Sequence, residues 1–312
     1  MICSSLRTSY GETLVELGKT NKDIVVLDAD LCKSTMGILF EQAYPDRFYE
    51  MGIAEANMAS VAAGLSLTGK IPFIASFAAF VPGRCYDQVR SSICIPNLNV
   101  KLCGSSAGLS DFGDGSTHQS IDDIALMRVL PHMQVFSPVD AVQTAQIVEY
   151  MASTHGPMYI RINRNDLPIL TSQEQPFVPG KVYSMRKGTD IAVFASGVTV
   201  SIALEAAKTL ASTGINVEVV NVPSIKPIDV SEVLDICERT KALVTFEEHS
   251  VYGGLGDAIS AIVAPKLARK HVRVGLQDVF GTSAQNYQVL LEHFGFVPKT
   301  IVKAVESLIS EL

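Results

Sequence analysis

The strongest constraint on the fold is a regular alternation of short β-branched runs with longer amphipathic stretches along the 312 residues. This alternation is typical of βα units that build a parallel sheet. In the first half it predicts strands at Ile24–Asp28, Phe48–Met51, Pro72–Phe77, Asn99–Cys103, Met133–Phe136 and Met158–Ile162. It predicts helices at Thr8–Lys19, Glu55–Leu67, Gly83–Ile95, Ile121–Leu130 and Ala141–Ser153.

A polar segment at residues 171–189, with two prolines and two glycines but no sustained period, is typical of a linker. A second alternating unit follows it. Its predicted strands are Ile191–Ala195, Val217–Val222, Leu243–Glu247 and Val272–Val274, and its predicted helices are Val198–Ala211, Val230–Thr240, Leu255–Leu267 and Thr300–Ser310. We therefore expect an α/β protein with two doubly wound, mostly parallel-sheet domains at residues 1–170 and 190–312.

Composition narrows the kind of protein and partner. With 47% hydrophobic and 18% charged residues, the chain is expected to fold into a globular protein. No apolar run reaches the ~18 residues of a membrane helix, and residues 1–10 lack the pattern of a signal peptide, so we expect a cytoplasmic protein. The net charge of −7 disfavours nucleic acid or an anionic membrane as a partner, whereas a small anionic ligand needs only one or two arginines.

The six cysteines and six histidines show no C-x-x-C pair and no H-x-x-x-H pair. In a cytoplasmic chain such cysteines are expected to be reduced thiols, most of them buried. We expect no metal site formed by this chain alone.

Glu55 is the first candidate for chemistry, because it interrupts a small, apolar stretch where a predicted strand gives way to a helix. In open parallel sheets this junction is where ligands bind. A carboxylate shielded from water there can take part in proton transfer. The alternative is a glutamate that stabilises a helix start through the helix dipole.

Two further clusters follow neighbouring predicted strands. Phe77 and Phe80, three residues apart, can form an apolar wall for a planar ring, although ordinary core packing is the commoner use. The loop at residues 104–119 carries four glycines together with Asp114, Thr117 and His118. Asp114 and His118 can hydrogen-bond a polyol, and Thr117 can position His118; a flexible surface loop is the alternative.

A fourth cluster lies at the end of the predicted strand Met158–Ile162. Arg161 and Arg164 can each bind a phosphate or sulfonate through two parallel N–H bonds. We favour Arg164, which begins the loop. A salt bridge is the competing use of either arginine.

Two glycine-rich motifs are weaker. Gly113-Asp114-Gly115 is similar to the start of a motif that binds a diphosphate through Mg²⁺, but residues 141–150, where its asparagine is expected, contain none. The chain is therefore expected to lack a diphosphate–metal site. The run Gly253-Gly254-Leu255-Gly256 opens a predicted helix and can bind an anion, although close packing of turn and helix is the favoured explanation.

Together, several ordered motifs resemble the C-terminal half of transketolases. They are GIAEANM, SFAAF, GDGSTHQS, RINRNDLP and EEHSVYGGLGDAI, and the resemblance covers nearly the whole chain. It implies a pyrimidine-binding domain followed by a transketolase C-terminal domain, as one subunit of a split transketolase. The N-terminal, diphosphate-binding half would be a separate partner chain that holds Mg²⁺ or Ca²⁺, in an expected α₂β₂ complex.

The resemblance also assigns roles. Glu55 would hydrogen-bond the aminopyrimidine of thiamine diphosphate, a cofactor that supplies the electron sink for cleaving a ketose C2–C3 bond. The remaining roles would be cofactor contacts by Phe77, Phe80 and Asp30, a catalytic contact by His118 near the transferred two-carbon unit, and substrate contacts by Asp114, His118, Arg164 and Ser34.

Departures from the family pattern leave the substrate open. Gly83 stands where an aromatic residue often completes the pyrimidine pocket, and Arg84-Cys85-Tyr86-Asp87-Gln88 resembles the deoxyxylulose-phosphate synthase branch, so Arg84 becomes a further candidate for the substrate anion. The alternatives are a carboligase of that type, a 2-oxoacid dehydrogenase β-subunit, and a non-catalytic assembly module, because fold alone does not establish function.

Overall fold

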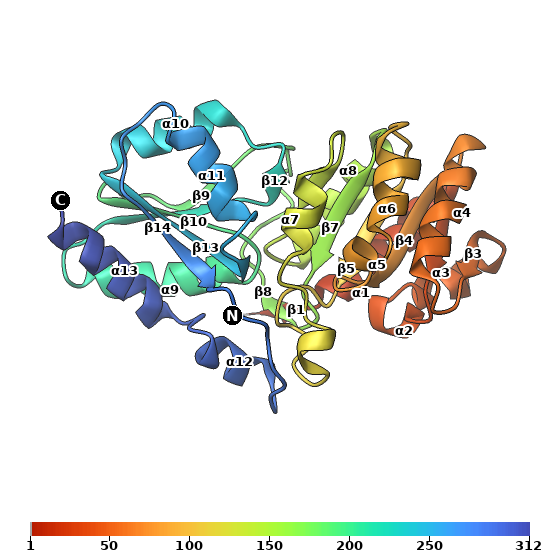
Figure 1. The fold of residues 1–312 in the computed structure, drawn as a ribbon, viewed down its shortest axis with the longest axis horizontal. Helices are drawn as coiled ribbons and strands as arrows, with labels where there is room; N and C mark the ends of the chain where they lie inside the picture. Colours follow the sequence, from red (N-terminus) through yellow and green to blue (C-terminus); the bar gives the residue numbers. More distant parts are fainter. Residues whose placement is uncertain (1) are drawn as a thin grey trace.

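The computed structural model describes residues 2–312, which form two α/β domains lying side by side (Figure 1). The first domain contains a seven-stranded sheet in the order β12-β6-β7-β5-β4-β2-β3. Its strands are β2 (Ile24–Asp28), β3 (Phe48–Glu50), β4 (Ile71–Phe77), β5 (Lys101–Ser105), β6 (Gln134–Phe136), β7 (Met158–Ile162) and β12 (Ser224–Lys226). All of its strand pairs are parallel except β12 with β6.

Helices cover both faces of this sheet because its strands carry apolar side chains on both faces. In β2, Ile24 and Val26 belong to one core cluster, while Val25 and Leu27 belong to the other. The first cluster includes residues of α1 (Leu6–Thr20), α3 (Ile38–Ala43) and α8 (Ala141–Ser153). The second is covered by α4 (Glu55–Leu67), α5 (Val81–Arg84), α6 (Tyr86–Gln88) and α7 (Asp123–Arg128).

The second domain contains a five-stranded sheet in the order β14-β13-β10-β11-β9. Its strands are β9 (Tyr183–Arg186), β10 (Ile191–Ala195), β11 (Val217–Asn221), β13 (Ala242–Ser250) and β14 (His271–Leu276). Helices α9 (Thr199–Ala211), α12 (Tyr287–His293) and α13 (Pro298–Ser310) lie on one face, and α10 (Val230–Arg239) and α11 (Leu255–Val263) on the other. Strand β9, which pairs antiparallel with β11, lies within the segment predicted as a linker.

The two domains are joined by backbone pairing as well as by side chains. β12 follows the second domain's β11 in sequence but pairs with β6 of the first sheet, and Ser137 donates its backbone N–H to the carbonyl of Pro223 at 2.8 Å. Both core clusters contain residues of both domains, so the apolar interior continues across the junction. The short strands β1 (Cys3–Ser4) and β8 (Leu167–Pro168) form a separate antiparallel pair.

The predicted fold class is confirmed, and β2, β7, β10, α4 and α8 have the predicted bounds. The single helix predicted at Gly83–Ile95 is wrong. The structure has α5 and α6 followed by a π-helical segment at Val89–Cys94. Pro82 at the start and Gly83 after it explain the short first turn, since both residues weaken a continuous helix.

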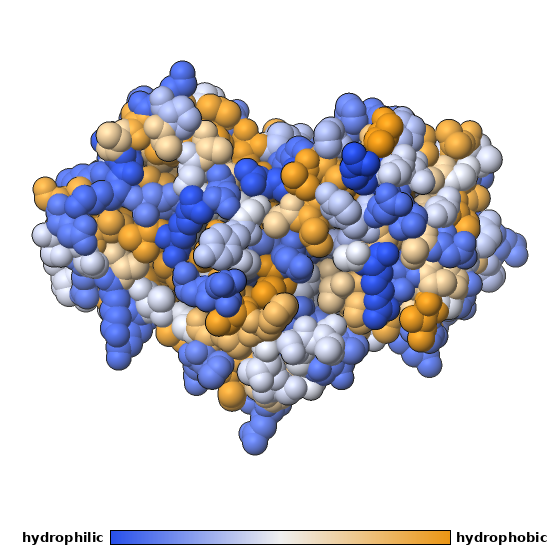
Figure 2. Space-filling view, in the orientation of Figure 1, coloured by the Kyte–Doolittle hydropathy of each residue, from blue (hydrophilic) through white to orange (hydrophobic). Residues whose placement is uncertain are grey.

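The surface seen in Figure 2 mixes hydrophilic and hydrophobic residues over both domains, and its outline is indented between them. Among residues 2–312, the helices are too short or too polar for any of them to cross a lipid bilayer.

Candidate functional site

The predicted clusters meet in a cavity of about 230 Å³ at the carboxyl edge of the first sheet. Its lining comes from the loop after β2, the start of α4, the α5 segment and the glycine-rich loop after β5. The lining residues are Ala29, Asp30, Leu31, Ile53, Glu55, Phe80, Arg84 and His118. Parallel strands bring these segments together because their carboxyl ends lie at the same edge of the sheet.

Glu55 is the first residue of α4, and its side chain is only 5% exposed. Arg84 Nη1 lies 2.6 Å from Glu55 Oε1, and the guanidinium carbon of Arg84 lies 3.7 Å from the centre of the Phe80 ring. A helix-start role alone would not require burial or a paired guanidinium. Glu55 is thus a nearly buried, paired carboxylate beside an aromatic face.

Phe77 and Phe80 form the predicted wall. Their ring centroids are 5.8 Å apart with planes inclined by 27°, and the imidazole of His118 packs edge-on against them, with centroids 6.0 and 5.2 Å away. Thr117 Oγ1 lies 3.0 Å from His118 Nδ1, so the threonine positions the imidazole as predicted. The wall offers one planar apolar surface and one ring nitrogen near it.

The loop after β2 is held by Asp28. Its carboxylate accepts hydrogen bonds from Leu31 N at 2.7 Å and Thr35 Oγ1 at 2.6 Å, and burial raises its pKa to about 7. Asp30 has a φ of 60° and lines the cavity, and Ser34 lies in the short helix α2 (Cys32–Thr35).

A second cationic group lies at the other end of the aromatic wall. Arg164 donates to Asp111 at 2.7 Å, and its guanidinium carbon is 5.8 Å from the centre of the Phe77 ring. Arg7, which no sequence motif marks, donates from Nη1 to the carbonyl of Ser34 at 2.8 Å. Burial and the nearby charge of Arg164 lower the pKa of Arg7. Within residues 2–312, its buried Nε has no hydrogen-bond partner.

Asp114 does not join this cavity. It is exposed at the start of the 3-10 turn Gly115–Thr117, and it is absent from the cavity lining. Arg161 adopts the competing use, a buried salt bridge with Asp123 in which Nε lies 2.9 Å from Oδ2. No group of three or more metal-ligating side chains occurs among the residues that the structure describes.

A larger cavity, about 590 Å³, lies between α7, β12 and α11 and is lined mainly by apolar side chains. Its two cations are already bonded to backbone carbonyls: Arg128 donates to Gly253 O at 3.2 Å, and Lys226 to Arg128 O at 3.0 Å. Since none of the clustered polar residues lines it, we place the candidate site in the smaller cavity.

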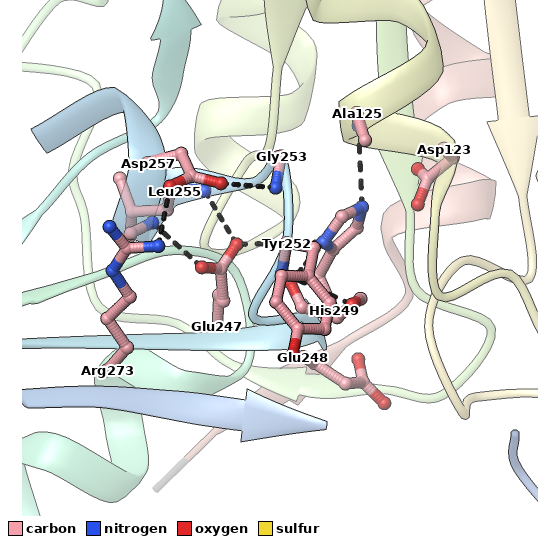
Figure 3. Close-up of polar contacts among 12 residues, drawn as sticks. Asp123, Ala125, Glu247, Glu248, His249, Tyr252, Gly253, Leu255, Asp257 and Arg273 are labelled. Carbon is pink, nitrogen blue, oxygen red and sulfur yellow. Dashed lines mark hydrogen bonds and ion pairs between the residues drawn. The ribbon is translucent and has the colours of Figure 1, made fainter. Parts of the chain in front are cut away.

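The start of α11 is filled by the chain's own carboxylate (Figure 3). Glu247 accepts from Leu255 N at 2.6 Å and from Gly256 N at 2.8 Å. A side chain on Gly254 would collide with this carboxylate, so close packing explains that glycine. Beside it, His249 Nδ1 donates to Ser250 O at 2.7 Å. This leaves its Nε2 to accept the N–H of Ala125 in α7 at 3.4 Å.

Glu248 connects the domains. Its Oε1 accepts from Leu109 N at 2.9 Å and from the Tyr287 hydroxyl at 2.8 Å. Gly108, with a φ of 65°, lies against it, and a Cβ there would be 2.5 Å from its carboxyl carbon. Burial raises the pKa of Glu248 to about 7, although Arg161 opposes the rise. No sequence pattern signals this contact, because it joins residues 139 positions apart.

We predict that Glu248→Gln changes the pH dependence of stability. Because the folded state favours the protonated carboxyl, the contribution of Glu248 is full below its ordinary pKa and falls as pH rises through about 7. The variant should match the wild type near pH 5 and exceed its free energy of unfolding at pH 8 by on the order of 2 kcal/mol. Denaturant titrations at both values measure this, with Glu306→Gln on the surface of α13 as control; equal slopes for all three proteins would contradict it.

Comparison with known proteins identifies related chains. Residues 4–169 match the family described as "Transketolase, pyrimidine binding domain", and residues 180–301 match "Transketolase, C-terminal domain". The chain is 40% identical to a putative transketolase C-terminal section of Methanocaldococcus jannaschii, covering 97% of this chain and 96% of that protein. It is also 40% identical to a 6-deoxy-6-sulfo-D-fructose transketolase subunit of a Clostridium species, covering 96% and 92%.

One of the two subunits of an apulose-4-phosphate transketolase of Actinobacillus succinogenes is 36% identical, covering 95% of this chain and 96% of that protein. Among solved structures, a split-gene transketolase described as an inactive β4 tetramer is 45% identical, with a TM-score of 0.89 and coverage of 98% of both chains.

Proposed function

The chain belongs to the transketolase family, and we propose that it is the C-terminal subunit of a two-chain transketolase. In this role it transfers a two-carbon ketol unit from an anionic ketose to an aldose. The observation that carries the proposal is the nearly buried Glu55 carboxylate beside the wall of Phe77, Phe80 and His118.

The cavity fits the aminopyrimidine ring of thiamine diphosphate, on which the family depends. It combines about 230 Å³ of space with a flat aromatic face and a carboxylate that can accept a hydrogen bond from a ring nitrogen. The bound cofactor supplies an electron sink for cleavage of a carbon–carbon bond. Glu55 holds the ring through its carboxylate, the phenylalanines stack on it and exclude water, and His118 presents its imidazole toward the reacting end.

Arg164, Arg7 and Ser34 support an anionic group at the far end of the sugar. Two guanidinium groups near one another repel unless an anion lies between them, and the buried Nε of Arg7 is a free donor within the described chain. The names of two relatives specify a sulfo-sugar and a sugar phosphate, both anionic. Asp30 and Asp114 are proposed as further contacts at the rim.

The partner is proposed from the relatives. Three chains of similar length are named as a section or subunit, and the similar solved structure that holds β chains alone is described as inactive. We propose a diphosphate-binding partner that holds Mg²⁺ or Ca²⁺, in an α₂β₂ complex. The helix start of α11, which could otherwise receive an anion, is filled by Glu247 of this chain.

Reconstitution tests the function. The chain and its partner are combined with thiamine diphosphate, Mg²⁺, an anionic ketose and an aldose, and the chain-extended product is followed by mass spectrometry. Ketol transfer is expected only with both chains present. Decarboxylation of pyruvate instead would favour the deoxyxylulose-phosphate synthase type, and failure of the complex to bind the cofactor would favour an assembly module.

Arg164→Met should act on the substrate anion. Loss of a charged hydrogen bond of about 1.5–3 kcal/mol should raise KM for an anionic ketose by about 10–100-fold. The same ketose without its anionic group, measured in parallel, should show a change of about threefold at most. An equal loss for both sugars would remove Arg164 from the anion site.

A further inference from the structure

Arg84 fills the part of the cavity that lies between Glu55 and Phe80. Its guanidinium pairs with Glu55 Oε1 at 2.6 Å and stacks at 3.7 Å over the Phe80 ring. The arginine side chain is 47% exposed, while that of Glu55 is 5% exposed. One planar cation thus uses both the carboxylate and the aromatic face of the site.

An aminopyrimidine ring would use the same two groups. Like a guanidinium, it is flat, carries N–H donors at its edge and stacks on aromatic faces. Two planar groups cannot both occupy one face of Phe80. We propose that Arg84 is a gate in this site: it holds the place of the cofactor ring and must swing away for the ring to bind. This inference rests on the proposed function.

The surrounding structure allows the side chain to move without the backbone. Val81 and Cys85, on either side of Arg84 in the chain, are fully buried, and Cys85 Sγ donates to Val81 O at 2.6 Å. Gly83 is exposed and has open space around it. The turn is therefore anchored while the half-exposed guanidinium has solvent to move into.

The gate also has a stabilising role. A nearly buried carboxylate without a partner destabilises a protein strongly, and Arg84 supplies that partner until a ring nitrogen replaces it. Binding of the ring then costs the free energy of separating the pair. The cofactor affinity of the wild type is lowered by that amount, and free pyrimidines bind weakly.

Arg84→Met tests the gate through binding. In the two-chain complex with Mg²⁺, calorimetry should give a dissociation constant for thiamine diphosphate about tenfold lower than that of the wild type, because a stacked ion pair no longer competes. Arg84→Lys keeps the charge but not the flat face and should give about a threefold decrease. The matched control is Arg90→Met, an exposed arginine in the next segment that lines a different cavity and should leave the dissociation constant unchanged.

A structure of the loaded complex provides a second measurement. The distance from Arg84 Nη1 to the Glu55 carboxylate should exceed hydrogen-bond length there. Unchanged or weaker binding by both Arg84 variants, or an Arg84–Glu55 pair that persists beside the bound ring, would overturn the gate while leaving the proposed function intact. If neither the wild type nor the variants bind thiamine diphosphate, the proposed function fails, and the gate with it.

Discussion

Glu55→Gln should lower the turnover of the reconstituted complex by about 100-fold or more, the usual effect of losing a positioned group in proton transfer. Glutamine keeps the size of the side chain and can still meet Arg84, so the cavity should keep its shape. It cannot offer a carboxylate to the ring nitrogen, which is the interaction that the proposal assigns to Glu55.

Two measurements check this result: steady-state turnover with an anionic ketose, and the rate at which the C2 proton of bound thiamine diphosphate exchanges with deuterium. Both should fall, while thermal unfolding stays near that of the wild type. Glu12→Gln, an exposed carboxylate on α1, should change neither rate. Full turnover and unslowed exchange in Glu55→Gln would exclude the assigned role.

Asp123→Asn should destabilise the folded chain by about 3–5 kcal/mol, the usual effect of breaking a buried ion pair from one side. Asp123 is fully buried and accepts from Arg161 Nε at 2.9 Å, from Arg161 Nη2 at 3.1 Å and from the Tyr159 hydroxyl at 2.7 Å. Burial alone would raise the pKa of the Asp123 carboxyl, but the charge of Arg161 holds it below its ordinary value. The variant leaves Arg161 as a buried cation without a countercharge.

The damage should reach the domain junction, because Arg161 Nη2 also donates to Glu248 O at 3.2 Å. Denaturant unfolding of the single variants and of Asp123→Leu with Arg161→Met gives the coupling, and the double variant should be more stable than the sum of single effects predicts. Asp23→Asn, which breaks the exposed pair with Lys70, should cost less than about 1 kcal/mol. A similarly small effect at Asp123 would show that its pair is dispensable.

Sequence patterns predicted most strands because buried parallel strands are short, continuous apolar runs. They also brought Glu55, Phe80 and His118 to one place, because each follows a strand whose end meets the same sheet edge. They could not show that a tight turn leaves Asp114 outside the cavity, since the sequence does not determine the direction of a loop side chain.

Long-range partners were the other limit. Arg7 lies in a helix start without a motif, and only folding brings it to Ser34 and Arg164. The contacts of Glu247, Glu248 and His249 depend on where β13 meets the first domain. The EEHS segment was informative only through resemblance, and no periodicity marks it.

The edge strand β12 limits how the chain can be dissected. A fragment cut between residues 171 and 189 would lose residues 224–226 and leave the hydrogen-bonding edge of β6 uncovered. Uncovered strand edges recruit other chains, so such a fragment would tend to self-associate. Engineers who wish to recombine the cofactor-binding half with other partners would need to carry this three-residue strand along, or redesign β6 with a charged residue or proline.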